Sequence, residues 1–147
     1  FTGVRLYPAK TENTYLRIEP ALALSKAAEE LRTMGLGIWV WDALRPYHVT
    51  VRFWELIKDE RYVAHPSKGS GHNRGIAIDL TLYKLETGEL LDMPTLFDDF
   101  SEQAHHGYNA ITDTQKNNRE LLRTIMEENG FIKFQTEWWH FHQQPCG

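Results

Sequence analysis

The sequence has little cysteine, no surplus of positive charge and no long hydrophobic run. Cys146 is the only cysteine, which excludes an internal disulfide framework and a cysteine-rich zinc site. The formal net charge is −4, whereas a nucleic-acid-binding domain normally carries a basic face. No apolar run approaches the ~20 residues that span a bilayer. We therefore expect no nucleic-acid partner and no membrane-spanning segment.

The length and the even composition predict a single domain over residues 1–147. A chain of this size can bury its own core, and no repeat or linker divides it. The lack of disulfides fits the cytoplasm. Polar residues follow Phe1 closely, so these residues do not form a signal peptide; a signal removed upstream would place the protein in the periplasm instead. The sequence does not indicate an oligomeric state.

Hydrophobic spacing, together with glycine and proline, predicts both helices and strands. The expected helices cover residues 21–34, 46–59 and 114–129, the last capped by Asp113. The expected strands cover residues 15–18, 36–41, 75–83, 131–134 and 138–142, with residues 90–91 returning after a turn at 86–89. Helices against a small, mostly antiparallel sheet make the expected fold α+β. The long polar loop at 94–111 is of a length that is often functional.

Two short segments far apart in the sequence carry the residue types of a metal-hydrolase site. The first reads SGHNRGIAID and supplies His72 and Asp79, and the second reads EWWH and supplies Glu137 and His140. Two neutral imidazoles and one carboxylate are what a catalytic zinc usually takes, with water in the fourth position. A second carboxylate beside that water is the general base that such a site needs. The pair of segments therefore predicts a metal site.

Each of these residues also has a structural interpretation. A lone histidine is more often structural than a ligand, and a strand aspartate usually forms a salt bridge. Asp79 lies in an apolar strand, where a buried carboxylate is costly unless it is paired or bound to a cation, so the combination favours a metal. We expect Glu137 on the turn entering the last strand, because an extended chain alternates sides. The other histidines are expected to be solvated or structural: His48, His65, His105, His106 and His142.

The two segments resemble the SxHxxGxAxD and ExxH signatures of the zinc D-alanyl-D-alanine dipeptidases of the VanX type, within the wider group of peptidoglycan zinc peptidases. Further similarities lie at residues 1–3, 41–46, 79–83, 97–98 and 117–140. The connection from Arg45 to His72 is shorter than in the best-known members. The residues that usually precede Phe1 are not part of this sequence.

The resemblance implies a hydrolase that acts on a small D,D-dipeptide, D-Ala-D-Ala, with one zinc ion per chain. It implies that His72, Asp79 and His140 bind this zinc at the centre of the sheet.

The resemblance also implies roles for four further side chains. Glu137 would be the catalytic base, and Arg45 would stabilise the tetrahedral intermediate. Asp98 would hold the ammonium group of the dipeptide, and Ser70 would contact substrate near the same end. The alternative for Arg45 is a salt bridge with Asp42, the residue that ends the strand expected at 36–41, and the alternative for Asp98 is a solvated acidic loop.

Three other functions remain open from the residues. A peptidoglycan D,D-carboxypeptidase or an L,D- or D,D-endopeptidase would use the same zinc site in a longer groove. A metal-dependent binding domain that has lost catalysis would need neither Glu137 nor Arg45, so their presence argues against it. A structural domain without metal would contain no zinc at all.

Overall fold

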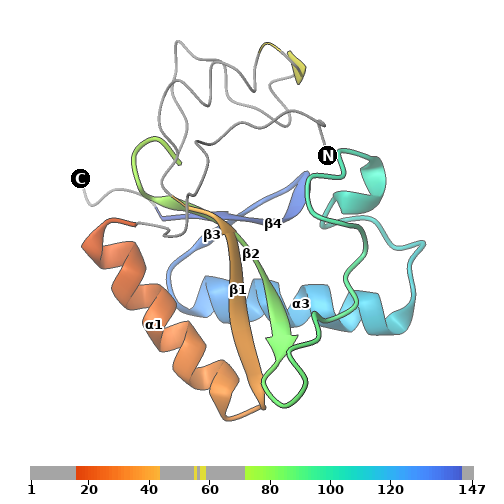
Figure 1. The fold of residues 1–147 in the computed structure, drawn as a ribbon. Coiled ribbons are helices and arrows are strands. Elements are labelled where there is room, and N and C mark those ends of the chain that lie inside the picture. The colour runs from red at the N-terminus through yellow and green to blue at the C-terminus, as the bar shows by residue number, and fades with distance from the viewer. Residues whose placement is uncertain (1–15, 44–54, 56, 59–71, 144–147) are drawn as a thin grey trace.

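The computed structural model describes residues 16–43, 55, 57–58 and 72–143. Their helices and strands are, in chain order, α1 (Ile18–Arg32), β1 (Leu36–Asp42), β2 (Ala77–Lys84), the 3-10 helix η1 (Glu102–Ala104), α3 (Asp113–Glu128), β3 (Ile132–Phe134) and β4 (Glu137–His142). Helices and an antiparallel sheet together confirm the α+β class (Figure 1). In the described part of the chain, every helix is too short or too polar to cross a membrane.

The sheet places two strands from distant parts of the sequence at its centre. Its strand order is β1-β2-β4-β3, and each neighbouring pair is antiparallel. Asp79 of β2 lies directly opposite His140 of β4. Side chains directly opposite each other in an antiparallel pair have Cβ atoms only about 5 Å apart. The topology alone thus brings together two of the predicted metal ligands, at the centre of the sheet, where the zinc site was expected.

The two faces of β2 have different surroundings. Alternate residues Ile78, Leu80 and Leu82 are fully buried and belong to one hydrophobic core. That core also contains side chains of the two helices: Ala27, Leu31, Leu122, Ile125 and Met126. Since successive strand residues point to opposite faces, α1 and α3 cover one face of the sheet. The side chains of Asp79 and Thr81 therefore lie on the other face.

The helix that was expected near the N-terminus is present, but the short strand before it is not. α1 begins at Ile18, within the range expected for a strand. Arg17 is extended and its N–H donates to Gly75 O at 2.9 Å, which is a single contact with the start of the β2 segment. The helix ends as predicted, because Gly35 adopts a left-handed φ of 75° that favours glycine. Tyr15 lies outside the described residues.

The C-terminal helix is confirmed with a different cap. Thr112, not Asp113, is the N-cap: its hydroxyl accepts from Gln115 N–H at 3.1 Å, and the Gln115 side chain accepts from Thr112 N–H at 3.2 Å. This reciprocal capping box satisfies two N–H groups that a helix start leaves unpaired. Asp113 lies one position inside the helix, where its negative charge still favours the helix N-terminus.

The remaining expected elements have mixed outcomes. β1, β3 and β4 form close to their predicted bounds. The return arm after the turn at residues 86–89 is present only as an isolated bridge between Leu90 and Tyr83. Most of the helix expected at residues 46–59 lies outside the described residues. The loop expected at residues 94–111 is irregular, as predicted, except for the short 3-10 helix η1.

Candidate metal centre

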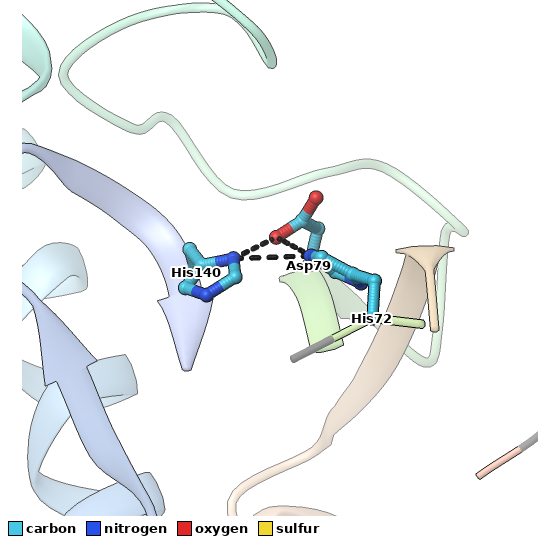
Figure 2. A group of neighbouring side chains, drawn as sticks. All are labelled: His72, Asp79 and His140. Carbon is cyan, nitrogen blue, oxygen red and sulfur yellow. Dashed lines mark hydrogen bonds and ion pairs between the residues drawn. The ribbon is translucent and has the colours of Figure 1, made fainter. Parts of the chain in front are cut away.

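Three side chains from separate segments converge on one point. His72 lies in the turn before β2, Asp79 in β2 and His140 in β4, and Figure 2 shows their donor atoms facing one another. His72 Nε2 is 3.1 Å from His140 Nδ1 and 3.3 Å from Asp79 Oδ1. His140 Nδ1 is 2.8 Å from Asp79 Oδ1. The structure thus brings together the three residues that were predicted as metal ligands.

The orientation of His72 is set by the backbone at the end of β1. Its Nδ1 lies 2.8 Å from the carbonyl oxygen of Ala43. A carbonyl only accepts hydrogen bonds, so Nδ1 carries a proton and donates it. The neutral ring then has its lone pair on Nε2, the atom that faces the other two ligands. A backbone carbonyl that fixes the tautomer of a ligand histidine is typical of metal sites.

The charge state of Asp79 also fits a ligand. Its side chain is buried, and this burial by itself would raise the pKa. In the absence of a metal, imidazoles of His72 and His140 that carry a proton toward Asp79 outweigh burial through their charge and hydrogen bonds, and they hold the pKa of Asp79 well below its usual range. The carboxyl group therefore stays ionised, as a metal ligand must be.

Two irregularities in the sheet lie beside this cluster. The β1–β2 register shifts between Val40 and Asp42, which places Asp42 opposite Asp79. The β3–β4 register shifts between Lys133 and Phe134, so that Phe134 pairs with Glu137. Bulges turn individual side chains away from strict alternation and are frequent next to active sites.

Glu137 is buried and begins β4, three residues before His140. It was expected on the turn entering this strand, and the structure places it one step further, inside the strand. Its neighbours Trp138 and Trp139 are almost completely buried members of the hydrophobic core.

Asp98 lies in the loop after β2 with a left-handed φ of 58°. Non-glycine residues rarely adopt this conformation, although aspartate tolerates it better than most. The preceding residue, Phe97, stacks on Trp41 with ring centroids 4.5 Å apart. This stacking anchors the residue that precedes Asp98. Two other predicted site residues, Arg45 and Ser70, lie outside the described residues.

The other described histidines do not belong to the group of three converging donors. His142 pairs with Ala77, and burial and the charge of His140 lower its pKa. His106 is buried, so of the two expected alternatives its role is the structural one. His48 and His65 lie outside the described residues.

Asp42 is the site residue that sequence reasoning missed. It is buried and its Oδ2 lies 3.9 Å from His72 Nδ1. In the sequence it was visible only as the end of a strand and as a salt-bridge partner for Arg45.

The donor set fits zinc. Zinc–nitrogen and zinc–oxygen bonds of about 2.0–2.2 Å in a tetrahedron place neighbouring donor atoms about 3.3 Å apart. The three separations here are 2.8, 3.1 and 3.3 Å. Among the described residues, two imidazole nitrogens and one carboxylate oxygen converge, which would leave a fourth tetrahedral position for water or substrate. Three protein ligands are typical of a catalytic zinc, whereas structural sites use four.

Comparison with known proteins places the chain among peptidases. Residues 1–146 match the peptidase family M15, described as D-Ala-D-Ala dipeptidase. The chain is 40% identical to a D-alanyl-D-alanine dipeptidase of Enterococcus faecium over 96% of this chain and 79% of that protein. It is 36% identical to a D-alanyl-D-alanine dipeptidase of Escherichia coli over 95% of this chain and 71% of that protein.

Two solved structures share the fold. The vancomycin-resistance D,D-pentapeptidase VanY, solved in complex with Zn(II), matches with a TM-score of 0.53 and 15% identity over 92% of this chain and 81% of that one. The LdcB LD-carboxypeptidase matches with a TM-score of 0.52 and 18% identity over 92% of this chain and 69% of that one. At such identities these likenesses concern the fold alone.

The fold, the His–Asp–His cluster and these matches define the class of protein, which is a metallopeptidase. Within this class, the chain belongs to the D-Ala-D-Ala dipeptidase family.

Proposed function

We propose that this protein hydrolyses the D-Ala-D-Ala dipeptide with one zinc ion held by His72, Asp79 and His140. The observation that carries the proposal is the convergence of their three donor atoms within 2.8–3.3 Å of one another. The family match over residues 1–146 supports the choice of substrate. The relatives in Enterococcus faecium and Escherichia coli are both named D-alanyl-D-alanine dipeptidase, which supports the same choice.

Proton transfer is the proposed role of Glu137. When bound, zinc supplies a Lewis acid that makes water nucleophilic near neutral pH. The Glu137 carboxylate accepts a proton from the attacking water and later delivers it to the leaving amine, the usual duty of a general base. Two features support this role: its burial at 5% exposure, and its place three residues before the ligand His140 at a bulge. Burial keeps bulk water from competing for the proton.

Charge stabilisation is the proposed role of Arg45. Attack on the peptide carbonyl places a negative charge on its oxygen, and a guanidinium is always charged and offers several donors. Arg45 follows the end of β1 by three residues, and Asp42, at that end, lies beside His72. This proximity along the chain supports its role.

Recognition of the free amino terminus is the proposed role of Asp98, with Ser70 contacting substrate near the same end. A left-handed φ of 58° at a non-glycine residue is uncommon, and such backbone positions cluster at ligand-binding sites. A carboxylate that pairs with an ammonium group rejects peptides whose amino terminus is blocked, because its own charge is then left unpaired.

Kinetics on free and blocked peptides test this function. Zinc-loaded protein should release D-alanine from D-Ala-D-Ala and act at least a hundredfold more slowly on N-acetyl-D-Ala-D-Ala, roughly the discrimination of a site built for a polar group. A chelator should abolish both activities. Equal rates on the two peptides would favour a D,D-carboxypeptidase instead.

A further inference from the structure

A pocket with a volume of about 350 Å³ lies on the sheet, lined in part by residues of β1, β2 and β4. Thr81 of β2 lines it, together with three aromatic side chains, Trp41, Phe97 and Trp138. Leucine and methionine side chains from the segment that follows β2 complete most of the remaining lining. The three metal ligands are absent from the described lining, so the pocket is distinct from the cluster.

The pocket opens on the same face of the sheet as the metal ligands. Thr81 lies two residues after Asp79 in β2, so their side chains share a face at a spacing of about 7 Å. Trp138 likewise precedes His140 by two residues in β4. A substrate whose reacting carbonyl lies at the cluster therefore has this pocket within reach of a side chain.

The aromatic side chains that line the pocket are fixed by one another. Trp41 stacks on Phe97 with centroids 4.5 Å apart, and meets Trp138 edge to face at 5.9 Å. The Trp138 indole N–H donates to Thr95 Oγ1 at 2.8 Å. Because these contacts already exist without a ligand, binding here costs little ordering of side chains.

Water has few partners in this pocket. Thr81 is 1% exposed, and its hydroxyl oxygen makes no hydrogen bond to any residue that the structure describes. An ordered buried water typically needs two to four polar partners. Apart from Thr81, the polar side chains of the lining are Asp92 and Thr95, and both already have partners: Asp92 Oδ1 accepts from Gln115 and Thr95 Oγ1 accepts from Trp138. Displacement of poorly ordered water by an apolar group improves binding. The pocket therefore suits an apolar side chain, and its volume far exceeds that of a methyl group.

We propose that this pocket receives the side chain of the amino-terminal residue of the dipeptide, and that the enzyme accepts D-residues as large as leucine or phenylalanine there. The inference rests on the proposed function. The choice of the amino-terminal residue follows from the chain: Thr95 and Phe97 line the pocket, and Asp98, the proposed ammonium partner, comes directly after them.

Substrate kinetics with zinc-loaded protein test the pocket first. D-Leu-D-Ala and D-Phe-D-Ala should be hydrolysed with kcat/KM within about tenfold of the value for D-Ala-D-Ala, because a matching pocket rewards each added methylene. D-Ala-D-Leu and D-Ala-D-Phe should be at least tenfold poorer than their reversed counterparts, about the cost of an unmatched apolar group. If the reversed pair is preferred, or all four peptides fail while D-Ala-D-Ala is cleaved, this inference is wrong. Failure of D-Ala-D-Ala itself would instead overturn the proposed function.

Two substitutions at Thr81 then separate pocket volume from hydroxyl chemistry. T81L extends into the pocket and should lower kcat/KM for D-Leu-D-Ala relative to D-Ala-D-Ala by about tenfold or more, the scale of a lost apolar fit. T81V keeps the volume and should leave that ratio within about threefold of wild type. Equal ratios in T81L and wild type would contradict the assignment.

A second variant covers the case in which T81L does not fold. Leu96 lines the rim of the pocket and is 84% exposed, so L96W changes the pocket without disturbing the core. It should lower the same ratio, whereas L85W, at an exposed leucine outside the described lining, should not. Tryptophan fluorescence of metal-free wild-type protein gives a readout independent of turnover: D-Leu-D-Ala should change it more than D-Ala-D-Leu does. Equal changes with both peptides would contradict the inference.

Discussion

His72 shows how a single backbone group prepares a side chain to bind metal. The Ala43 carbonyl accepts from Nδ1 at 2.8 Å and leaves the lone pair on Nε2, 3.3 Å from Asp79 Oδ1. The motif in the sequence predicted both residues as ligands. It did not predict the carbonyl, because a backbone contact across 29 residues depends on the fold and carries no side-chain signature.

The acidic neighbour of His72 gives a prediction at this scale. Asp42 Oδ2 lies 3.9 Å from His72 Nδ1, and groups behind a ligand histidine tune its basicity. D42N should weaken zinc affinity by about ten- to a hundredfold, measured by competition with a chromogenic chelator. An unchanged affinity would show that the Ala43 carbonyl alone orients the ring.

Glu137 gives a second prediction at the residue scale. E137Q keeps the shape of the side chain but removes its ability to accept a proton, so kcat on D-Ala-D-Ala should fall by about 10²–10⁴-fold. Zinc content, measured by elemental analysis, should stay at one equivalent, because Glu137 is not among the three converging ligands. E128Q, at an exposed position that ends α3, is the matched control and should leave kcat unchanged. Wild-type turnover in E137Q would exclude Glu137 as the base.

At the scale of elements, hydrophobic spacing located α1, β1, α3, β3 and β4 well, since each buries a regular apolar pattern. The expected strand at residues 15–18 was wrong because Ile18, although β-branched, is the first residue of α1 and is exposed. The two register shifts could not be predicted, because a bulge depends on the partner strand. These bulges matter most at the site, next to Asp79 and Glu137.

The cap of α3 gives a prediction at this scale. Thr112 and Gln115 form a reciprocal capping box, and the Gln115 amide also donates to Asp92 Oδ1 at 3.2 Å. T112A should lower the free energy of unfolding by about 1 kcal/mol, measured by urea denaturation. D113A, at the position the sequence favoured, should have a smaller effect. The opposite order would restore Asp113 as the cap.

For the whole molecule, the sequence predicted the class and the antiparallel sheet, and it singled out the three residues that the fold brings together. These residues could be found because they lie in short local motifs, and because burial of an apolar strand around Asp79 demands a partner for its charge. The pocket at Thr81 was not predicted, since its lining comes from β1, β2, β4 and the segment between β2 and α3. Only the packed structure brings these segments together.

The dependence of stability on pH gives a prediction for the whole molecule. Burial lowers the pKa of His106 to about 4, and the charges of Lys133 and Arg119 act in the same direction. The unfolded chain takes up a proton at His106 near pH 6.5, whereas the folded chain does so only near pH 4. The contribution of neutral His106 to the free energy of unfolding is therefore complete above pH 6.5 and is lost as the pH falls toward 4. At the acid end of this range, the free energy of unfolding should be lower by about 3 kcal/mol because of His106.

Urea denaturation of metal-free protein across this pH range measures the loss. H106L cannot take up the proton, so its unfolding free energy should fall less steeply between about pH 6.5 and pH 4 than that of wild type. Parallel pH profiles for H106L and wild type would show that other groups cause the acid sensitivity.

The central claim is that the three converging side chains hold one zinc ion that is needed for hydrolysis of D-Ala-D-Ala. The most direct measurement is a zinc titration of chelator-stripped protein, followed by release of D-alanine from this dipeptide. Activity should be absent at the start, rise linearly and level off at one equivalent of zinc, and H140A should show no such rise. Full activity in the stripped protein, or no activity at saturating zinc, would contradict the account.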